Sequence, residues 1–181
     1  MKRDPNPVVL IAALMAVDPP FLARSKERLV QAWGEIELES PVFEFTFTDY
    51  YRQEMGEKLI KQFVSFGKPI SMACLADIKG FTLSLEGQLS QPGEGMQRRR
   101  VNVDPGYLSM DNLVLATTKH RGHRICIAPG LYAEVTLLYQ SGRFQPLDWT
   151  YADYRTELAQ NFFRAVRKRL SFHRADVGGA K

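Results

Sequence analysis

Polar side chains recur along one side of several expected β-strands between residues 98 and 140. Side chains alternate across a strand, so Arg100, Asn102 and Asp104 share one face of the first expected strand, opposite Val101 and Val103. A face that fills a core should be apolar, because burying an unpaired polar or charged group is costly. The pattern therefore indicates either a ligand site or a water-facing side of the sheet.

A second polar row lies on the strand expected at 131–140, where Tyr132, Glu134 and Thr136 share one face. Between the two rows, the strand expected at 113–119 ends in Lys119, and Arg124 opens the next one. The connections are short, which predicts antiparallel neighbours, and antiparallel pairing can place polar rows side by side.

These residue types favour recognition of an anion. Arginine binds phosphate or carboxylate through two parallel hydrogen bonds, and lysine adds a point charge. The sequence therefore predicts a polar pocket on the sheet for an anionic small molecule, a nucleotide or another phosphate compound. The residues expected to bind this ligand are Arg100, Asn102, Lys119, Arg124, Tyr132 and Thr136.

Three side chains could add chemistry to binding. Asp104 and Glu134 could hold a divalent metal beside the anion, or act as general acid and base. His123 could transfer a proton, since histidine titrates near neutral pH. The competing interpretation is a water-facing sheet laced by cross-strand ion pairs, in which Glu134 pairs with a nearby lysine or arginine. Whether the protein is an enzyme stays open.

No signature of several large enzyme classes is present in the chain. It lacks the phosphate loop GxxxxGK(S/T), a GxGxxG after the first expected strand, a GxSxG elbow and an HExxH pair. Enzyme classes that depend on those motifs are therefore disfavoured.

Two other function classes fit the distribution of charged and aromatic residues. Basic residues cluster at 98–100 and 164–174 and could contact nucleic-acid phosphates, with Tyr50, Tyr51 or Tyr107 stacking on bases. Alternatively, a strand edge or the aromatic-rich segment at 43–51 could form a homodimer.

Composition predicts one folded domain. The 181 residues are 45% hydrophobic and 24% charged, with a net charge of +4. We expect a single domain over residues 1–174 and a disordered tail at 175–181. The apolar run at 8–17 is too short to span a bilayer, so a cytoplasmic protein without a membrane partner is expected. Cys74 and Cys126 stand in apolar surroundings, which predicts buried, reduced thiols.

The expected elements give an α+β fold. We expect a buried strand at 7–16, a helix at 21–33, a strand at 41–47, a helix at 50–66 and a last helix over 158–170. The segment 71–89 fits a helix better than a strand, although its alternation allows either. Strands at 98–103, 113–119, 124–127 and 131–140 form a β-meander over residues 98–140, with Asp104-Pro105-Gly106 as one of its turns. The sheet should be mostly antiparallel, with helices packed mainly on one side.

Several short motifs are together similar to one prokaryotic family. They are Tyr50-Tyr51-x-x-Glu54-Met55-Gly56, Asn102-x-Asp104-Pro105-Gly106-Tyr107, Leu115-Ala-Thr-x-Lys119, His123-Arg124-Ile125, Tyr132-x-Glu134-Val-Thr136-Leu137 and Trp149-Thr-x-x-Asp153-Tyr154. From Pro7 to about Arg169, the chain resembles the family known as domain of unknown function 4416. The resemblance implies that the polar rows matter, and it supplies no particular chemistry.

Overall fold

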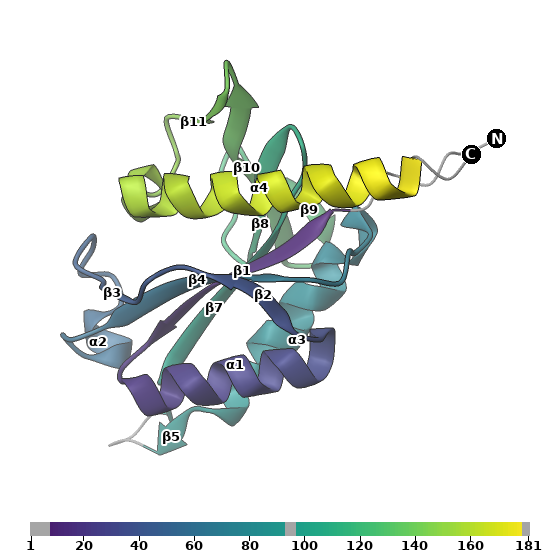
Figure 1. Cartoon of the computed structure of the whole chain (residues 1–181). Helices are drawn as coiled ribbons and strands as arrows, with labels where there is room; N and C mark the ends of the chain where they lie inside the picture. Colours follow the sequence, from purple (N-terminus) through teal and green to yellow (C-terminus); the bar gives the residue numbers. More distant parts are fainter. Residues whose placement is uncertain (1–7, 93–96, 179–181) are drawn as a thin grey trace.

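One large antiparallel sheet organises the protein (Figure 1). The computed structural model describes residues 8–92 and 97–178. The strands are β1 (Val9–Ala16), β2 (Ile36–Glu39), β3 (Phe43–Glu44), β4 (Ile60–Phe66), β5 (Gln91–Pro92), β6 (Gln97–Arg98), β7 (Val101–Leu108), β8 (Asn112–Thr117), β9 (Ile125–Ala128), β10 (Leu131–Gln140) and β11 (Arg143–Pro146). The sheet runs in the order β11-β10-β8-β7-β1-β4-β2, with β3 beside β4 and β9 beside β10.

Four α-helices and two short 3-10 helices accompany these strands in the described part of the chain. They are α1 (Pro19–Trp33), α2 (Arg52–Met55), η1 (Met72–Cys74), α3 (Leu75–Gln88), η2 (Ala152–Arg155) and α4 (Glu157–Gly178). The chain order β1-α1-β2-β4-α3-β7, with the spatial order β7-β1-β4-β2, is the split βαβ arrangement called ferredoxin-like. The predicted α+β class with a mostly antiparallel sheet is therefore confirmed.

Helices cover the two faces of the sheet, as Figure 1 shows for α1 below β1 and α4 above it. Leu10, Ala12 and Leu14 of β1 pack in one apolar cluster with residues of α1 and α3. Ile11 and Ala13 pack in another cluster with residues of α4. All of β1 is buried, as expected for a strand covered on both faces. Two of the three long helices thus share one face.

The helix expected at 50–66 is wrong. Helix α2 covers only Arg52–Met55, and Gly56 follows it with a φ of 98°, a conformation that glycine adopts readily. Ile60–Phe66 instead forms β4, which pairs with β1 and is buried from Lys61 onward. A strand buried on both faces carries apolar residues at neighbouring positions, and here their spacing imitated a helix.

Other expected elements are confirmed or adjusted. The segment expected as a helix at 71–89 contains α3, and the strand expected at 131–140 is β10. The strand expected at 41–47 is reduced to β3. The turn expected at Asp104-Pro105-Gly106 is wrong, because β7 continues through these residues to Leu108.

The predicted burial of the two cysteines is wrong. Cys74 and Cys126 are both free and exposed. Cys74 stands at the N-cap of α3, and Cys126 lies on β9, a strand off the main path of the sheet. Ile125 beside it is 72% exposed, so apolar neighbours in the sequence did not indicate burial there.

Two expectations concern the ends of the chain and the membrane. Helix α4 extends to Gly178, and residues 179–181 of the tail expected at 175–181 lie outside the described residues. Within residues 8–92 and 97–178, no helix has the length and apolar character needed to cross a bilayer.

Candidate functional site

The sheet opens between β7 and β8. Strand β7 pairs with β1 over its full length, from Val101 opposite Ala16 to Leu108 opposite Val9. Its pairing with β8 ends at Gly106, opposite Leu115. Residues 101–105 therefore present an edge that β8 does not cover, and the two strands separate around a space.

Two buried side chains of α3 take the place of β8 along this edge. Glu86 Oε1 accepts a hydrogen bond of 2.7 Å from the backbone N–H of Val103. The Lys79 ammonium donates a hydrogen bond of 3.1 Å to the Val103 carbonyl oxygen. Buried backbone groups without partners are costly, so these two bonds stabilise the separation of the strands.

Pro105 suits the same open edge. The N–H and C=O groups of successive residues point to opposite edges of a strand. Because the Arg100 carbonyl oxygen accepts a hydrogen bond from Val17 on the β1 side, Val103 and Pro105 direct their backbone groups to the opening. Proline has no N–H there to leave unpaired, which explains its place inside a strand.

A cavity of about 520 Å³ occupies this opening, the size of sites that enclose drug-sized ligands. Its walls come from the segment 45–54, from β4, α3, β7 and η2, and from the end of β8 with the loop that follows. The charged residues that line it are Lys61, Lys79, Arg99, Lys119, Arg121, Arg124, Glu54, Glu86, Asp104 and Asp153. Basic side chains thus outnumber acidic ones around the cavity.

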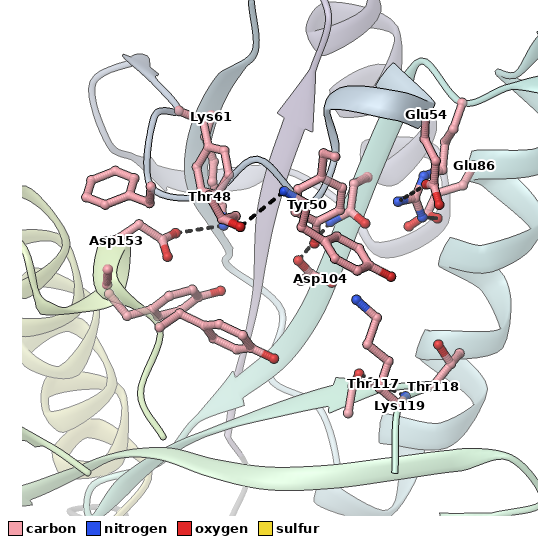
Figure 2. A pocket seen from close by; sticks show the side chains of 18 of the residues that line it. Thr48, Tyr50, Glu54, Lys61, Glu86, Asp104, Thr117, Thr118, Lys119 and Asp153 are labelled. Carbon is pink, nitrogen blue, oxygen red and sulfur yellow. Dashed lines mark hydrogen bonds and ion pairs between the residues drawn. The ribbon is translucent and has the colours of Figure 1, made fainter. Parts of the chain in front are cut away.

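Lys61 and Asp153 form a buried ion pair at one end of the cavity (Figure 2). The Lys61 ammonium lies 2.7 Å from Asp153 Oδ2, and both side chains are at most 6% exposed. The same ammonium lies over the rings of Phe45 and Tyr154, at 5.0 and 5.3 Å from their centroids. These rings and the carboxylate compensate the desolvation of the lysine.

Arg99 joins two carboxylates at the other end of the cavity, where Figure 2 shows Glu54 and Glu86 side by side. Its guanidinium lies 2.9 Å from Glu54 Oε2 and 3.2 Å from Glu86 Oε2. Burial raises the pKa of Glu86, and the nearby Lys79 ammonium opposes that shift. The charged side chains at this end of the cavity are therefore already paired with one another.

Asp104 lies between these two ends (Figure 2). Its Oδ2 accepts a hydrogen bond of 2.8 Å from the Asn102 side-chain amide, and its Oδ1 lies 3.8 Å from the Lys79 ammonium. The side chain of Asp104 is 31% exposed, so a ligand in the cavity could contact this carboxylate.

Three tyrosines of the cavity lining have raised pKa values, and Asp104 is among the causes for each of them. Burial and then Asp104 raise the pKa of Tyr51. Burial, followed by Glu134, raises the pKa of Tyr151 to about 12. Burial, followed by Asp153 and Asp104, holds the pKa of Tyr154 well above its usual value. These hydroxyls are therefore neutral hydrogen-bond donors throughout the physiological pH range.

Lys119 brings an ammonium group into the cavity. Figure 2 shows it extending from the end of β8 toward Tyr50, and its Nζ lies 3.7 Å from the centroid of that ring. Within the part of the chain that the structure describes, no carboxylate forms an ion pair with it. An unpaired cation beside a cavity is suited to bind an anion.

Arg124 connects the cavity to a buried carboxylate behind it. Its Nε lies 2.6 Å from Glu134 Oε2, and its Nη atoms donate to the Lys119 carbonyl oxygen at 2.7 Å and to the Tyr151 hydroxyl at 2.8 Å. His123 Nε2 lies 3.3 Å from the same Glu134 oxygen, and its ring stacks on Trp149 at 4.8 Å. Glu134 thus holds Arg124, which in turn holds the loop that carries Lys119.

The structure brings together some of the expected site residues and separates others. Asn102, Asp104, Lys119 and Arg124 line the cavity. The residues that do not line it are Glu134, His123, Thr136, Arg100 and Tyr132.

Those five residues have other surroundings. Glu134 and Thr136 are buried, and the Thr136 hydroxyl donates to Glu134 Oε1 at 3.2 Å. The Arg100 guanidinium lies over the ring of Phe21, 5.1 Å from its centroid, and the Tyr132 ring packs near His120.

The expected metal site has no geometric support. Asp104 lines the cavity, whereas Glu134 is occupied by Arg124, His123 and Thr136. Among residues 8–92 and 97–178, no group of three or more histidine, cysteine or acidic side chains could hold a metal ion.

Sequence reasoning missed Lys61, Asp153, Tyr151 and Tyr154 as site residues. The mistaken helix at 50–66 concealed Lys61, whereas a charged residue inside a buried strand would have indicated a site. The motif Trp149-Thr-x-x-Asp153-Tyr154 contains the other side chains, so the sequence carried a signal for them. The polar row of Lys79, Thr82 and Glu86 on the helix expected at 71–89 was a further available signal.

The basic clusters are largely occupied by contacts within the chain. Arg99 joins Glu54 and Glu86. On α4, the Arg167 guanidinium lies 3.5 Å from the centroid of the Tyr139 ring and donates to the Met110 carbonyl oxygen at 2.8 Å. Binding of nucleic acid and formation of a homodimer stay predictions.

Comparison with known proteins identifies a family. No curated protein and no solved structure matches the chain. The model of the family described as domain of unknown function (DUF4416) matches residues 6–170 of the 181 residues. This match covers the sheet, the helices as far as residue 170 of α4, and all of the cavity-lining residues, so the chain belongs to the DUF4416 family.

Proposed function

We propose that the cavity binds an anionic small molecule carrying a phosphate or a comparable anionic group. The observation that carries this proposal is the Lys119 ammonium, which faces the cavity with an aromatic ring beside it and no carboxylate partner among the described residues. Arg121 lines the cavity on the same loop. An anion placed at these side chains gains charge-assisted hydrogen bonds, which are stronger than neutral ones.

Hydrogen-bond donors around the cavity support the same conclusion. The raised pKa values of Tyr51 and Tyr151 keep their hydroxyls protonated, so they can donate hydrogen bonds to an anion without becoming charged themselves. Basic side chains outnumber acidic ones in the lining, and the acidic ones at the two ends are already paired. The electrostatic environment therefore favours a negative ligand.

Asp104 is the candidate for any proton transfer that follows binding. Of the expected acid–base residues, it alone lines the cavity, whereas Glu134 and His123 lie behind Arg124. A general acid or base must come within hydrogen-bond reach of the reacting atom. The proposal for catalysis therefore rests on Asp104, and Glu134 is proposed to position Arg124.

Calorimetric titration of the purified protein with phosphate compounds tests binding. Nucleotides and sugar phosphates form the first panel. We expect Lys119→Ala to weaken binding about ten- to a hundred-fold, the loss expected for one charge-assisted hydrogen bond. Lys68→Ala is the matched control, because Lys68 is exposed and lies outside the cavity. Equal affinity of the Lys119→Ala variant and the wild type would refute the proposal.

A further inference from the structure

A buried tyrosine hydroxyl lacks a partner at the Lys61 end of the cavity. Tyr154 is 1% exposed and lines the cavity, and its hydroxyl forms no hydrogen bond with any described residue. The ring itself is fixed by stacking on Phe163 at 5.7 Å and by edge contact with Phe63 at 5.1 Å. Buried hydroxyls are nearly always hydrogen-bonded in native proteins, so this one requires an explanation.

The adjacent carboxylate is also incompletely satisfied. Asp153 Oδ2 lies 2.7 Å from the Lys61 ammonium, yet no hydrogen bond of suitable angle reaches that oxygen. Asp153 is 2% exposed and lines the cavity beside Tyr154. Tyr154 thus has an unused hydrogen-bond donor and Asp153 has an unused acceptor, and these neighbouring residues lie at the same end of the cavity.

We infer that Asp153 and Tyr154 form a subsite for a hydroxyl group, so that the ligand is a hydroxylated anion such as a sugar phosphate or a sugar acid. A hydroxyl both donates and accepts hydrogen bonds, which is the combination that these two side chains lack. The inference rests on the proposed function, because it places the anionic group of the same ligand at Lys119.

The charges at this end favour a neutral group of the ligand. Lys61 and Asp153 neutralise each other, so neither an anion nor a cation would find a compensating charge there. An uncompensated buried charge is costly, whereas a hydroxyl meets only the two open hydrogen-bonding positions. Two parts of the cavity therefore differ in charge: Lys119 presents a cation without a carboxylate partner among the described residues, whereas the end at Tyr154 is polar and neutral.

The test compares four probes by calorimetry: ribose 5-phosphate, inorganic phosphate, gluconate and ribose. The variants are Tyr154→Phe, Lys119→Ala and the control Tyr139→Phe, whose ring lies outside the cavity against Arg167. We expect Tyr154→Phe to weaken binding of ribose 5-phosphate about three- to tenfold, the loss of one neutral hydrogen bond, without affecting inorganic phosphate. Lys119→Ala should weaken binding of both ribose 5-phosphate and inorganic phosphate. If gluconate binds and ribose 5-phosphate does not, the anionic group of the ligand is a carboxylate.

Every other result excludes the hydroxyl subsite, the anionic ligand, or both. If Tyr154→Phe binds ribose 5-phosphate like the wild type while Lys119→Ala loses it, the hydroxyl subsite is wrong and anion binding stands. If ribose binds as well as its phosphate and only Tyr154→Phe reduces it, the anionic ligand is wrong. If no probe binds, both are wrong.

Thermal unfolding without ligand gives an independent readout. Removing an unpaired buried hydroxyl while keeping the ring should leave the Tm of Tyr154→Phe equal to or above that of the wild type. A lower Tm would show that the hydroxyl has a partner in the free protein, and the subsite would then be overturned.

Discussion

Glu86 accepts a hydrogen bond from the backbone N–H of Val103, so a carboxylate of α3 occupies the position that a neighbouring strand would otherwise take. Lys79 binds the carbonyl oxygen of Val103 at the same edge, and the two side chains together take the place of β8 there. The cavity lies in the opening that these two contacts border. The arrangement makes the stability of the opening sensitive to the charge of Glu86.

The Glu86→Gln variant should gain stability relative to the wild type, measured as the free energy of unfolding, as pH rises above about 4.5, the ordinary pKa of the Glu86 carboxyl. Burial raises the pKa of Glu86 in the folded protein, so the folded state binds this proton more tightly than the unfolded state does. The wild type therefore loses stability as pH rises from 4.5 through the folded pKa, and the neutral amide does not. Urea unfolding at several pH values measures the difference, with exposed Glu27→Gln as control. A difference independent of pH would contradict this expectation.

Gly106→Ala should destabilise the fold by about 3 kcal/mol. A Cβ at Gly106 would lie 2.3 Å from the Val114 carbonyl oxygen and 2.7 Å from Leu115 Cδ2, at the last point where β7 and β8 pair. The matched control is Gly80→Ala inside α3, where a Cβ meets nothing within 4 Å and a gain of up to about 1 kcal/mol is expected. Equal stabilities of the two variants in urea would show that the strands can move apart at this point.

Alternation along strands brought together several residues that line the cavity. Asn102 and Asp104 share a face of β7, and Lys119 and Arg124 flank the next loop, so simple spacing brought these four into one cavity. Arg100 precedes β7, and its guanidinium lies over the Phe21 ring, so extending the alternation by two residues misplaced it. Periodicity is informative only within the true bounds of an element.

The rest of the site depends on contacts between residues that are far apart in the sequence. Lys61 lies within β4, whose apolar positions were interpreted as a helix, and its partner Asp153 is far along the chain. Glu134 looked available for chemistry because a carboxylate in the middle of a strand needs a basic partner. The structure shows that Arg124 and His123 already contact the Glu134 carboxylate. Which basic side chain pairs with Glu134 depends on the tertiary structure and could not be read from the sequence.

Lys61→Met should destabilise the protein by about 3–5 kcal/mol, because Asp153 would remain as a buried charge without a cation. The double variant Lys61→Met/Asp153→Asn should recover much of this loss, since it removes both charges. A surface pair provides the control: Lys26→Met breaks the exposed pair with Glu39 and should cost at most about 1 kcal/mol. If the double variant is no more stable than Lys61→Met, the loss comes from packing on Phe45 and Tyr154 instead of charge.

Both cysteines should react with a thiol reagent in the native protein. Cys74 and Cys126 are free and exposed, and exposed thiols are accessible without unfolding. A chromogenic disulfide reagent at pH 8 should therefore titrate the full thiol content before denaturant is added. The Cys74→Ser and Cys126→Ser variants assign the two reactions. A thiol that reacts only after denaturation would contradict its exposed position.

Glu134→Gln should weaken anion binding although Glu134 does not line the cavity. The carboxylate holds Arg124 at 2.6 Å, and Arg124 donates to the Lys119 carbonyl oxygen, so the loop at 118–124 loses its anchor when the charge is removed. A buried ion pair that loses one partner also lowers stability, so binding must be measured well below the Tm of the variant. Increased hydrogen exchange in residues 118–124 together with weaker binding would identify Glu134 as a positioning residue. Unchanged affinity with a lower Tm would instead limit Glu134 to a structural role, because Lys119 would then be held in place without it.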